Sequence, residues 1–394
     1  MMPKSKLPDV GTTVFTVMSQ RAAETGAINL GQGFPDYPID PRLAELVHRA
    51  MAEGHNQYAP MAGLAALREQ IAVKLQRTYG IAVDPGSEVT VTLGATEGLY
   101  SAIQALAGPG DEVIVFDPAY DSYDPAVRLA GARCLHLPLE PPGFRPDWDR
   151  VRQVLSPATR VIVVNSPQNP ACSCLSTADL DELAQLLRGF DCCVLADEVY
   201  EHMVYDGARH ASVLAHPELR ARSVAVFSFG KTLHATGLRV GYAVGPQALT
   251  LELRKVHQFN TFTIATCLQQ AIAGYLRERP DCGAELPAFF QAKRDRLAQL
   301  LAGSGLRALP AAGSCFLLAD YSAVSDLGDV DLAHALIAEA GVATIPLSVF
   351  YREPPPMKLL RLCFAKRNET LVEGARRLGG WARGRRSKEG VADG

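Results

Sequence analysis

The sequence contains no apolar run long enough to cross a bilayer, and its first residues lead into no apolar segment typical of a signal peptide. Its formal net charge is only −3, which gives no global field that would favour nucleic acid or an anionic membrane surface. Internal repeats and low-complexity segments are also missing. These absences exclude membrane-spanning, solenoid and strongly basic nucleic-acid-binding classes, and we expect a globular cytoplasmic protein.

Metal-binding patterns are scarce as well. The nine cysteines form no Cys-x₂₋₄-Cys pair, because Cys172 and Cys174 are too close together and Cys192 and Cys193 are adjacent within an apolar run. No histidine-rich cluster completes such a site. We therefore expect no bound metal, and instead small buried thiols in a reducing compartment.

The pattern that the chain does contain is an alternation of strand-like and helix-like stretches from about residue 86 to residue 245. This alternation predicts a mostly parallel sheet with helices on both faces. The predicted strands span 88–93, 111–116, 160–165, 192–196 and 223–227, and the predicted helices include 95–106 and 177–187.

The remainder of the chain has a different pattern. A long helical stretch at 284–302 is followed by strands at 315–318 and 358–364 and by helices at 330–340 and 369–378. Since 394 residues exceed what one hydrophobic core usually covers, we expect two domains. The large domain would span 46–285, and the small α+β domain would combine 1–45 with 286–394.

Two familiar motifs are incomplete around Lys231. The run Gly230-Lys231-Thr232 resembles the end of a P-loop, but Ala225 stands where that motif requires its first glycine. Ser228 and Lys231 also fit the Ser-x-x-Lys pattern of acylating serine enzymes, yet the companion motifs of those enzymes are missing. Neither an NTPase nor an acylating serine enzyme is therefore favoured.

A lysine and a carboxylate each follow a predicted buried strand. Lys231 comes shortly after the strand at 223–227, and Asp197 comes directly after the strand at 192–196. Because ligands bind at strand ends in an open α/β sheet, we expect the two side chains to face one crevice. This pair suits pyridoxal 5'-phosphate, since the amine can condense with its aldehyde and the carboxylate can keep its ring nitrogen protonated.

Candidate phosphate-binding groups accompany this pair. Arg239 offers a fixed charge and a planar fork of donors, and Ser228 adds a hydroxyl. The predicted helix that begins near Ala95 and Thr96 supplies free backbone N–H groups at its positive end.

Taken together, these positions resemble the fold-type I pyridoxal-phosphate-dependent aminotransferases of class I/II. The resemblance covers nearly the whole chain and is closest to the branch of bacterial methionine aminotransferase and kynurenine–oxoglutarate aminotransferase. The stretches that carry it are LPDVGTT at 7–13, NLGQGFPD at 29–36, NQYAP at 56–60, FDPAYDSY at 116–123, KVHQ at 255–258 and LRLCFAK at 360–366.

The resemblance implies an α/β fold in which a mostly parallel seven-stranded sheet lies between helices, next to a small α+β domain. It implies pyridoxal 5'-phosphate as cofactor, with Lys231, Asp197 and Tyr200 as catalytic residues. The implied cofactor-binding residues are Ala95, Thr96, Tyr120, Asn169, Asp197, Tyr200, Ser228, Lys231, Arg239 and Tyr58, the last reaching the neighbouring subunit of a homodimer with composite active sites.

The resemblance also implies a substrate site. Arg361 would bind the α-carboxylate with help from Asn169 and the Gly33 backbone, and Phe15 and Phe262 are candidates for the side-chain pocket. Residues 258–266 contain no Arg or Lys that could bind a second carboxylate. We therefore expect an apolar or aromatic amino donor, such as methionine, phenylalanine, tyrosine or kynurenine, and a 2-oxo acid acceptor.

The sequence departs from this branch at Gln168, Cys172, Cys174 and Cys267, which bears on substrate preference rather than on the reaction. One alternative on the same scaffold is a β-lyase that acts on cysteine conjugates. Another is the effector-binding domain of a transcriptional regulator, which carries a helix-turn-helix domain ahead of this scaffold. Only about thirty residues precede Gly31, so we expect no such domain.

Overall fold

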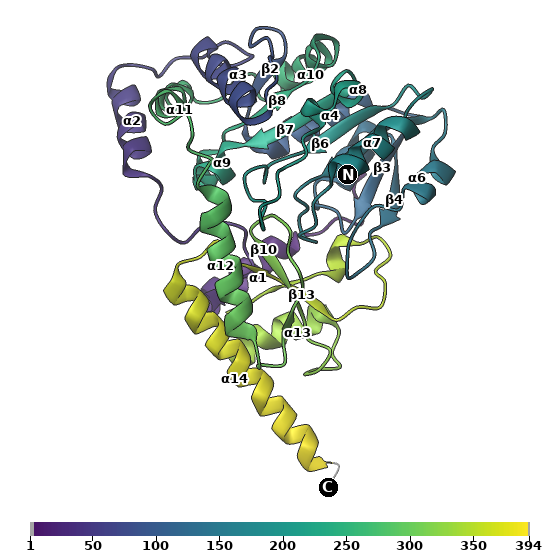
Figure 1. Ribbon diagram of the computed structural model, residues 1–394, viewed down its shortest axis with the longest axis vertical. Helices are drawn as coiled ribbons and strands as arrows, with labels where there is room; N and C mark the ends of the chain where they lie inside the picture. Colours follow the sequence, from purple (N-terminus) through teal and green to yellow (C-terminus); the bar gives the residue numbers. More distant parts are fainter. Residues whose placement is uncertain (1–3, 393–394) are drawn as a thin grey trace.

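The computed structural model describes residues 4–392, with side chains through Arg385. A seven-stranded sheet forms the centre of its larger part, in the order β2–β8–β7–β6–β5–β3–β4 (Figure 1). The strands are β2 (Val89–Thr92), β3 (Glu112–Asp117), β4 (Arg133–Pro138), β5 (Thr159–Asn165), β6 (Cys193–Asp197), β7 (Ser223–Ser228) and β8 (Gly241–Val244). Only β8 runs against the others, so the expected mostly parallel sheet is confirmed.

Helices cover both faces of this sheet. Along β5, Ile162 and Val164 contact one layer of helices, while Val161 and Val163 contact the other. The first layer comprises α3 (Ala65–Tyr79), α6 (Trp148–Val154), α7 (Thr177–Leu186) and α11 (Thr266–Glu278), and the second comprises α4 (Gly94–Leu106), α5 (Tyr123–Ala130) and α10 (Gln247–Asn260). Burial on both faces explains why these strands are continuous apolar runs in the sequence.

The smaller part of the structure contains a four-stranded antiparallel sheet in the order β12–β13–β10–β9. Its strands are β9 (Arg307–Ala308), β10 (Phe316–Asp320), β12 (Ile345–Pro346) and β13 (Leu359–Cys363). The N-terminal segment joins this part, because β1 (Ile28–Asn29) pairs in parallel with β11 (Val342–Ala343). One hydrophobic core connects the sheet with α1 (Val14–Thr25), α12 (Leu286–Leu301), α13 (Asp329–Ala335) and α14 (Asn368–Ala392).

The helix α12 runs from the large sheet towards the small one and lies beside α14 (Figure 1). The helix α2 (Pro41–Ala52) packs instead on α11, and its Leu43 is fully buried in the core of the large sheet. The expected boundary between residues 45 and 46 falls inside α2. We propose that the large domain begins before Pro41, because the whole of α2 packs as one unit.

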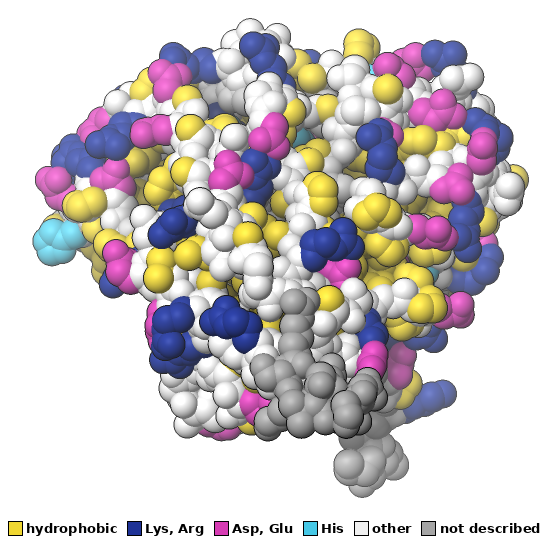
Figure 2. All heavy atoms as spheres, turned by 60° about the horizontal axis from the view of Figure 1, so that its bottom comes forward, with side chains coloured by type: hydrophobic (Ala, Val, Ile, Leu, Met, Phe, Trp, Pro, Cys, Tyr) yellow, Lys and Arg dark blue, Asp and Glu magenta, His cyan; other side chains and the backbone are white. Residues whose placement is uncertain are grey.

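Short elements complete the chain. They are α8 (Pro217–Arg220), α9 (Phe229–Thr232), the 3₁₀ turns η1 (Val213–Ala215), η2 (Thr236–Leu238) and η4 (Ser348–Phe350), and the π-helical turn η3 (Leu336–Ala340) that continues α13. Among residues 4–392, none of the helices combines the length and the apolar composition that crossing a bilayer requires. Acidic and basic side chains are intermixed on the face shown in Figure 2.

Candidate active site

A cavity of about 300 Å³ lies where the last residues of three neighbouring parallel strands meet the small domain. Asn165 ends β5, Asp197 ends β6 and Ser228 ends β7, and all three line the cavity. Every residue that the sequence predicted for the site also lines it, except Tyr58 and Phe262. The ends of neighbouring parallel strands lie at one edge of the sheet and thus bring together groups that are far apart in the chain.

Lys231 reaches the cavity from α9, which follows β7 directly. Its Nζ donates a hydrogen bond to the backbone oxygen of Gly33 over 3.0 Å and lies 5.5 Å from the centre of the Tyr200 ring. Burial lowers the pKa of the Lys231 ammonium below its ordinary value. A lysine whose pKa is lowered in this way is more often neutral, and can serve as a nucleophile or as a base.

Asp197 forms a second wall of the cavity and is only 4% exposed. Its carboxylate accepts hydrogen bonds from the Tyr123 hydroxyl over 2.5 Å and from the Val199 N–H over 3.4 Å. Burial raises the pKa of Asp197 to about 6, although these two bonds and the charge of Lys231 oppose the increase. A buried carboxylate of this kind is suited to pairing with a protonated nitrogen of a ligand.

Asn165 was missed by the sequence analysis but ties the Asp197 strand to the neighbouring loop. Its Nδ2 donates to the backbone oxygen of Asp197 over 2.8 Å, and its Oδ1 accepts the N–H of Asn169 over 2.8 Å. Asn165 is the last residue of a predicted strand, and this position could have indicated it as a site residue. Tyr123 lies inside α5 and carried no such signal.

One end of the cavity is built for an anion. Thr96, Ser228 and Arg239 line it, together with the first turn of α4, whose N-terminus has no side-chain cap. Gly94 has φ of 69°, and a Cβ at this position would lie 2.7 Å from Arg239 Nη2. The backbone thus approaches the guanidinium closely, and free N–H groups, a hydroxyl and an arginine together match a phosphate.

The other end of the cavity contains Arg361, which is 1% exposed. Its Nη1 donates to Asn169 Oδ1 over 2.5 Å and its Nη2 donates to the Gly31 backbone oxygen over 2.7 Å, while its buried Nε has no partner among the described residues. Burial lowers the pKa of this guanidinium. A buried cation with neutral partners and an unpaired donor is suited to binding a carboxylate.

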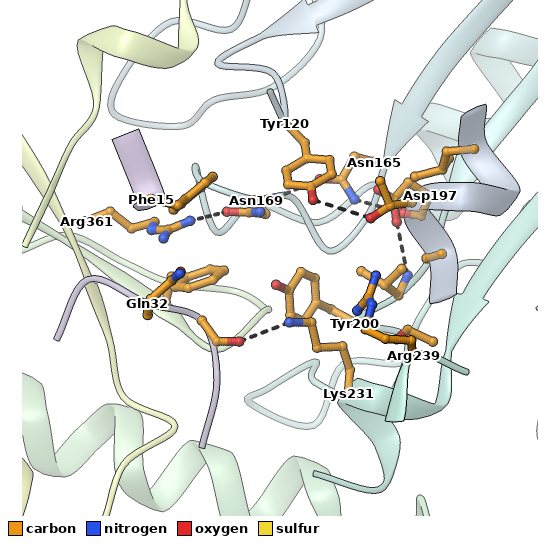
Figure 3. Close-up of a pocket in the computed structure, with 17 residues that line it drawn as sticks. Phe15, Gln32, Tyr120, Asn165, Asn169, Asp197, Tyr200, Lys231, Arg239 and Arg361 are labelled. Carbon is orange, nitrogen blue, oxygen red and sulfur yellow. Dashed lines mark hydrogen bonds between the residues drawn. The ribbon is translucent and has the colours of Figure 1, made fainter. Parts of the chain in front are cut away.

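Aromatic side chains hold the guanidinium of Arg361 in place. Its central carbon lies 3.9 Å from the centre of the Phe316 ring and 4.9 Å from that of Phe15. Figure 3 shows Arg361 and Phe15 on one side of the cavity, Asp197 on the opposite side and Lys231 between them. Phe316 also lines the cavity, from β10, and was not among the residues predicted for the site.

Tyr58 and Phe262 lie outside this cavity. Tyr58 is 86% exposed and Phe262 is 41% exposed, and their rings meet edge to face with centres 5.5 Å apart. The residues that depart from the family pattern also lie away from the cavity lining: Gln168, Cys172, Cys174 and Cys267. Gln168 is buried and bonds to the backbone of Pro118 and Ala171, which gives it a structural part in the loop.

Comparison with known proteins agrees with this arrangement. The chain matches the family described as aminotransferase class I and II over residues 25–378. It is 51% identical to methionine aminotransferase of Escherichia coli (strain K12). The 378 aligned residues cover 96% of this chain and 98% of that protein. A solved E. coli structure, described as identifying a methionine aminotransferase function, superposes with a TM-score of 0.94 and covers 96% of this chain and 100% of the other.

More distant relatives match over most of their length. Kynurenine–oxoglutarate transaminase 3 of Rattus norvegicus is 33% identical over 396 residues and covers 93% of this chain and 87% of that protein. The solved N-succinyldiaminopimelate aminotransferase of Mycobacterium tuberculosis is 38% identical with a TM-score of 0.92, covering 97% of this chain and 100% of the other. The match in sequence, fold and length shows that this chain belongs to the class I and II aminotransferase family.

Proposed function

We propose that this aminotransferase uses pyridoxal 5'-phosphate to move the amino group of an apolar or aromatic L-amino acid to a 2-oxo acid. The observation that supports this most directly is the placement of Lys231 and Asp197 on the walls of one cavity. The buried amine can bind the aldehyde carbon of this cofactor, and the buried carboxylate can pair with its protonated ring nitrogen.

The residues present fit this cofactor. Ser228, Arg239 and the first turn of α4 would hold its phosphate, because all of them line the end of the cavity where Gly94 keeps the backbone close to the arginine. Asp197 would pair with the ring nitrogen, and the aromatic ring of Tyr120 would lie against the ring face. Tyr200 and Asn169 also line the cavity and would contact the ring oxygen.

The cofactor would supply an aldehyde and an electron-withdrawing ring that together make the α-proton of the amino acid acidic. Lys231 would remove this proton from the α-carbon and deliver a proton to the cofactor carbon that carried the aldehyde oxygen, because burial keeps its Nζ readily deprotonated. With the acceptor it would move a proton in the opposite direction, onto the α-carbon of the new amino acid. Arg361 would hold the α-carboxylate through two parallel hydrogen bonds, so that the bond to the α-hydrogen stays oriented towards Lys231.

An uncharged donor side chain is supported by the rest of the lining. Beside Arg361, Lys231 and Arg239, no cation lines the cavity among the described residues, and Phe15 and Phe316 form part of its wall. The relatives named for methionine and for kynurenine indicate the same preference. Since an apolar pocket separates side chains that differ by a methylene by only about 1–3 kcal/mol, we expect broad specificity.

We also propose that the enzyme acts as a homodimer with composite active sites. Tyr58 and Phe259 are each 86% exposed, and Phe262 is 41% exposed. Large aromatic side chains exposed to this degree are typical of an interface. In such a dimer, Tyr58 of one chain would contact the phosphate in the other, and Phe262 would border the substrate pocket of the partner.

A half-reaction scan tests the function. Purified enzyme is mixed with one amino acid at a time, and the absorbance of the bound cofactor is followed as it is converted to its aminated form. We expect methionine, phenylalanine, tyrosine and kynurenine to react faster than aspartate. A faster reaction with aspartate would contradict the proposed donor class, and the release of pyruvate and ammonia from a cysteine conjugate without added 2-oxo acid would reveal the β-lyase alternative.

The covalent attachment is tested separately. Borohydride reduction followed by peptide mass mapping should place the cofactor on Lys231, and Lys231→Ala should lose both the label and turnover. Lys255→Ala, in the exposed part of α10, provides the control and should keep both. Label on another lysine, or normal turnover in Lys231→Ala, would refute the role of Lys231.

A further inference from the structure

Three side chains that are typical metal ligands lie together at the edge strand β4, and none of them lines the cavity described above. Cys134 and His136 are two residues apart on β4, so they project from the same face of the strand. Asp124 lies on α5, which packs beside β4. The strand is the outermost of the large sheet, where Figure 1 labels it next to β3.

The distances among the three ligand atoms suit a tetrahedral ion. His136 Nε2 lies 3.4 Å from Asp124 Oδ1, and two ligands with zinc bonds of about 2.0–2.1 Å at a tetrahedral angle lie about 3.3 Å apart. All three ligand atoms, including Cys134 Sγ, are within 4.8 Å of one another. A zinc-bound sulfur and a zinc-bound nitrogen or oxygen at a tetrahedral angle lie about 3.6 Å apart, which is within this limit.

Outer partners already orient two of these ligands. His136 Nδ1 lies 2.9 Å from Asp117 Oδ1, and Asp117 is 3% exposed and accepts the Arg352 N–H through its other oxygen. If Nδ1 carries the proton donated to Asp117, the lone pair of Nε2 faces Asp124. Arg128 Nη1 in turn donates to Asp124 Oδ2 over 3.2 Å, which leaves Oδ1 turned towards His136. Ligands held by such partners are the usual arrangement around bound metals.

The surrounding charges do not oppose a cation. Arg128, Arg133 and Arg352 border the same hollow, but each pairs with a carboxylate. Arg128 and Arg352 pair with Asp9, and Arg133 pairs with Glu112. Asp117 and Asp124 add two further carboxylates. A surface hollow of about 620 Å³ borders Asp124, Cys134 and His136, so solvent can reach the group and provide a fourth ligand.

We propose that Asp124, Cys134 and His136 bind a zinc ion, with water in the fourth position. A set of one nitrogen, one sulfur and one oxygen suits Zn²⁺, whereas Mg²⁺ and Ca²⁺ prefer oxygen alone. The ion lies between His136 Nε2 and Asp124 Oδ1, and its binding requires an unprotonated Nε2 and the loss of the thiol proton of Cys134. The sequence did not indicate a metal site, because Cys134 and His136 provide only two ligands. The third ligand, Asp124, lies beside them only in the folded structure, where α5 packs against β4.

The test uses full-length, tag-free enzyme that has been treated with a chelator and dialysed. Cobalt(II) is added as the probe, because a cobalt–thiolate bond gives a near-ultraviolet charge-transfer band and tetrahedral coordination gives intense visible bands. Zinc binding is measured in parallel by calorimetry and by the thermal midpoint, which a ligand of the folded state raises. We expect one ion per chain and displacement of cobalt by zinc.

Matched variants identify the ligands. Cys134→Ser should abolish the charge-transfer band and the zinc-dependent rise of the thermal midpoint, while Cys282→Ser, which replaces another partly buried thiol, should change neither. Asp117→Asn, which removes the charge of the outer partner of His136 and leaves all three proposed ligands in place, should weaken zinc binding by about 10–100-fold. Circular dichroism confirms that each variant is folded.

Three results would overturn the proposal. They are the absence of a charge-transfer band in the wild type, a band that survives in folded Cys134→Ser, and a band that is lost in Cys282→Ser. Because none of these residues lines the active-site cavity, the readouts are independent of transaminase activity. Failure of the metal site would therefore leave the proposed function untouched, and the reverse also holds.

Discussion

Tyr123 donates its hydroxyl proton to the buried carboxylate of Asp197 across 2.5 Å, and so links the start of α5 to the end of β6. This bond opposes the effect of burial on the pKa of Asp197. The next residue, Asp124, lies instead beside His136 at the edge of the sheet. The first turn of α5 therefore contributes to the active site through one residue and to the proposed zinc site through its neighbour.

The raised pKa of Asp197 predicts a specific pH dependence of stability. In the cofactor-free protein this pKa rises from 3.8 to about 6, so the folded state holds a proton that the unfolded state has released. The stability that Asp197 contributes relative to Asp197→Asn should fall as pH rises through this window. A shift of about two pH units corresponds to about 3 kcal/mol.

Urea unfolding of cofactor-free wild type and Asp197→Asn, at intervals from about pH 4 to about pH 7, measures this difference. Other titrating groups occur in both proteins and cancel in the comparison. A difference in unfolding free energy that does not change with pH would show that the folded state does not raise the pKa of Asp197.

Gly94 and Gly54 allow conformational strain to be separated from contact with the phosphate site. Both have positive φ, 69° and 89°, but only at Gly94 would a Cβ meet another group, Arg239 Nη2 at 2.7 Å. Gly94→Ala and Gly54→Ala should each cost on the order of 1 kcal/mol of stability. Only Gly94→Ala should also weaken the binding of pyridoxal 5'-phosphate, by about tenfold or more, because it displaces Arg239.

Fluorescence titration of the cofactor into the two cofactor-free variants gives their affinities, and thermal unfolding gives their stabilities. Equal affinities in Gly94→Ala and Gly54→Ala would mean that the close approach of Gly94 to Arg239 does not shape the phosphate site.

Arg361→Lys should impair every amino donor. Lysine keeps the positive charge, but it cannot make two parallel hydrogen bonds or stack on Phe316 as the guanidinium does at 3.9 Å. The loss of a charged hydrogen bond, about 1.5–3 kcal/mol, predicts a 10- to 100-fold lower kcat/KM, mainly through KM. Steady-state kinetics with methionine and phenylalanine measure the effect, and Arg307→Lys on the exposed strand β9 is the control. An unchanged KM would exclude Arg361 as the carboxylate-binding residue.

The sequence predicted five of the seven strands of the large sheet, and it missed the buried strand β8 between β2 and β7 as well as the edge strand β4. The predicted strand at 192–196 corresponds to β6 (Cys193–Asp197), and that at 223–227 corresponds to β7 (Ser223–Ser228). The edge strand β4 was not predicted, because Arg133 and His136 interrupt its apolar pattern. Strands whose side chains face solvent carry a weaker signal than strands covered by two layers of helices.

The C-terminal helix shows how tertiary packing can override local preference. The sequence predicted a helix at 369–378, and Gly379 and Gly380, which are typical helix stop signals, follow it directly. The observed helix α14 continues to Ala392. Beyond the glycines, Ala382 is fully buried and Trp381 Nε1 donates to Glu339 Oε2 over 2.7 Å. These contacts offset the cost of the two glycines in the helix.

For the site, the sequence by itself determined which groups stand at the ends of buried strands. Lys231, Asp197 and Ser228 could be placed there because strand periodicity and turn position are local properties. Only the tertiary structure decided that Arg361 lies beside Gly31 and Asn169, that Tyr123 reaches Asp197, and that Asp124 joins Cys134 and His136. These contacts join elements far apart in the chain, and they depend on how helices and sheets pack, which no local pattern encodes.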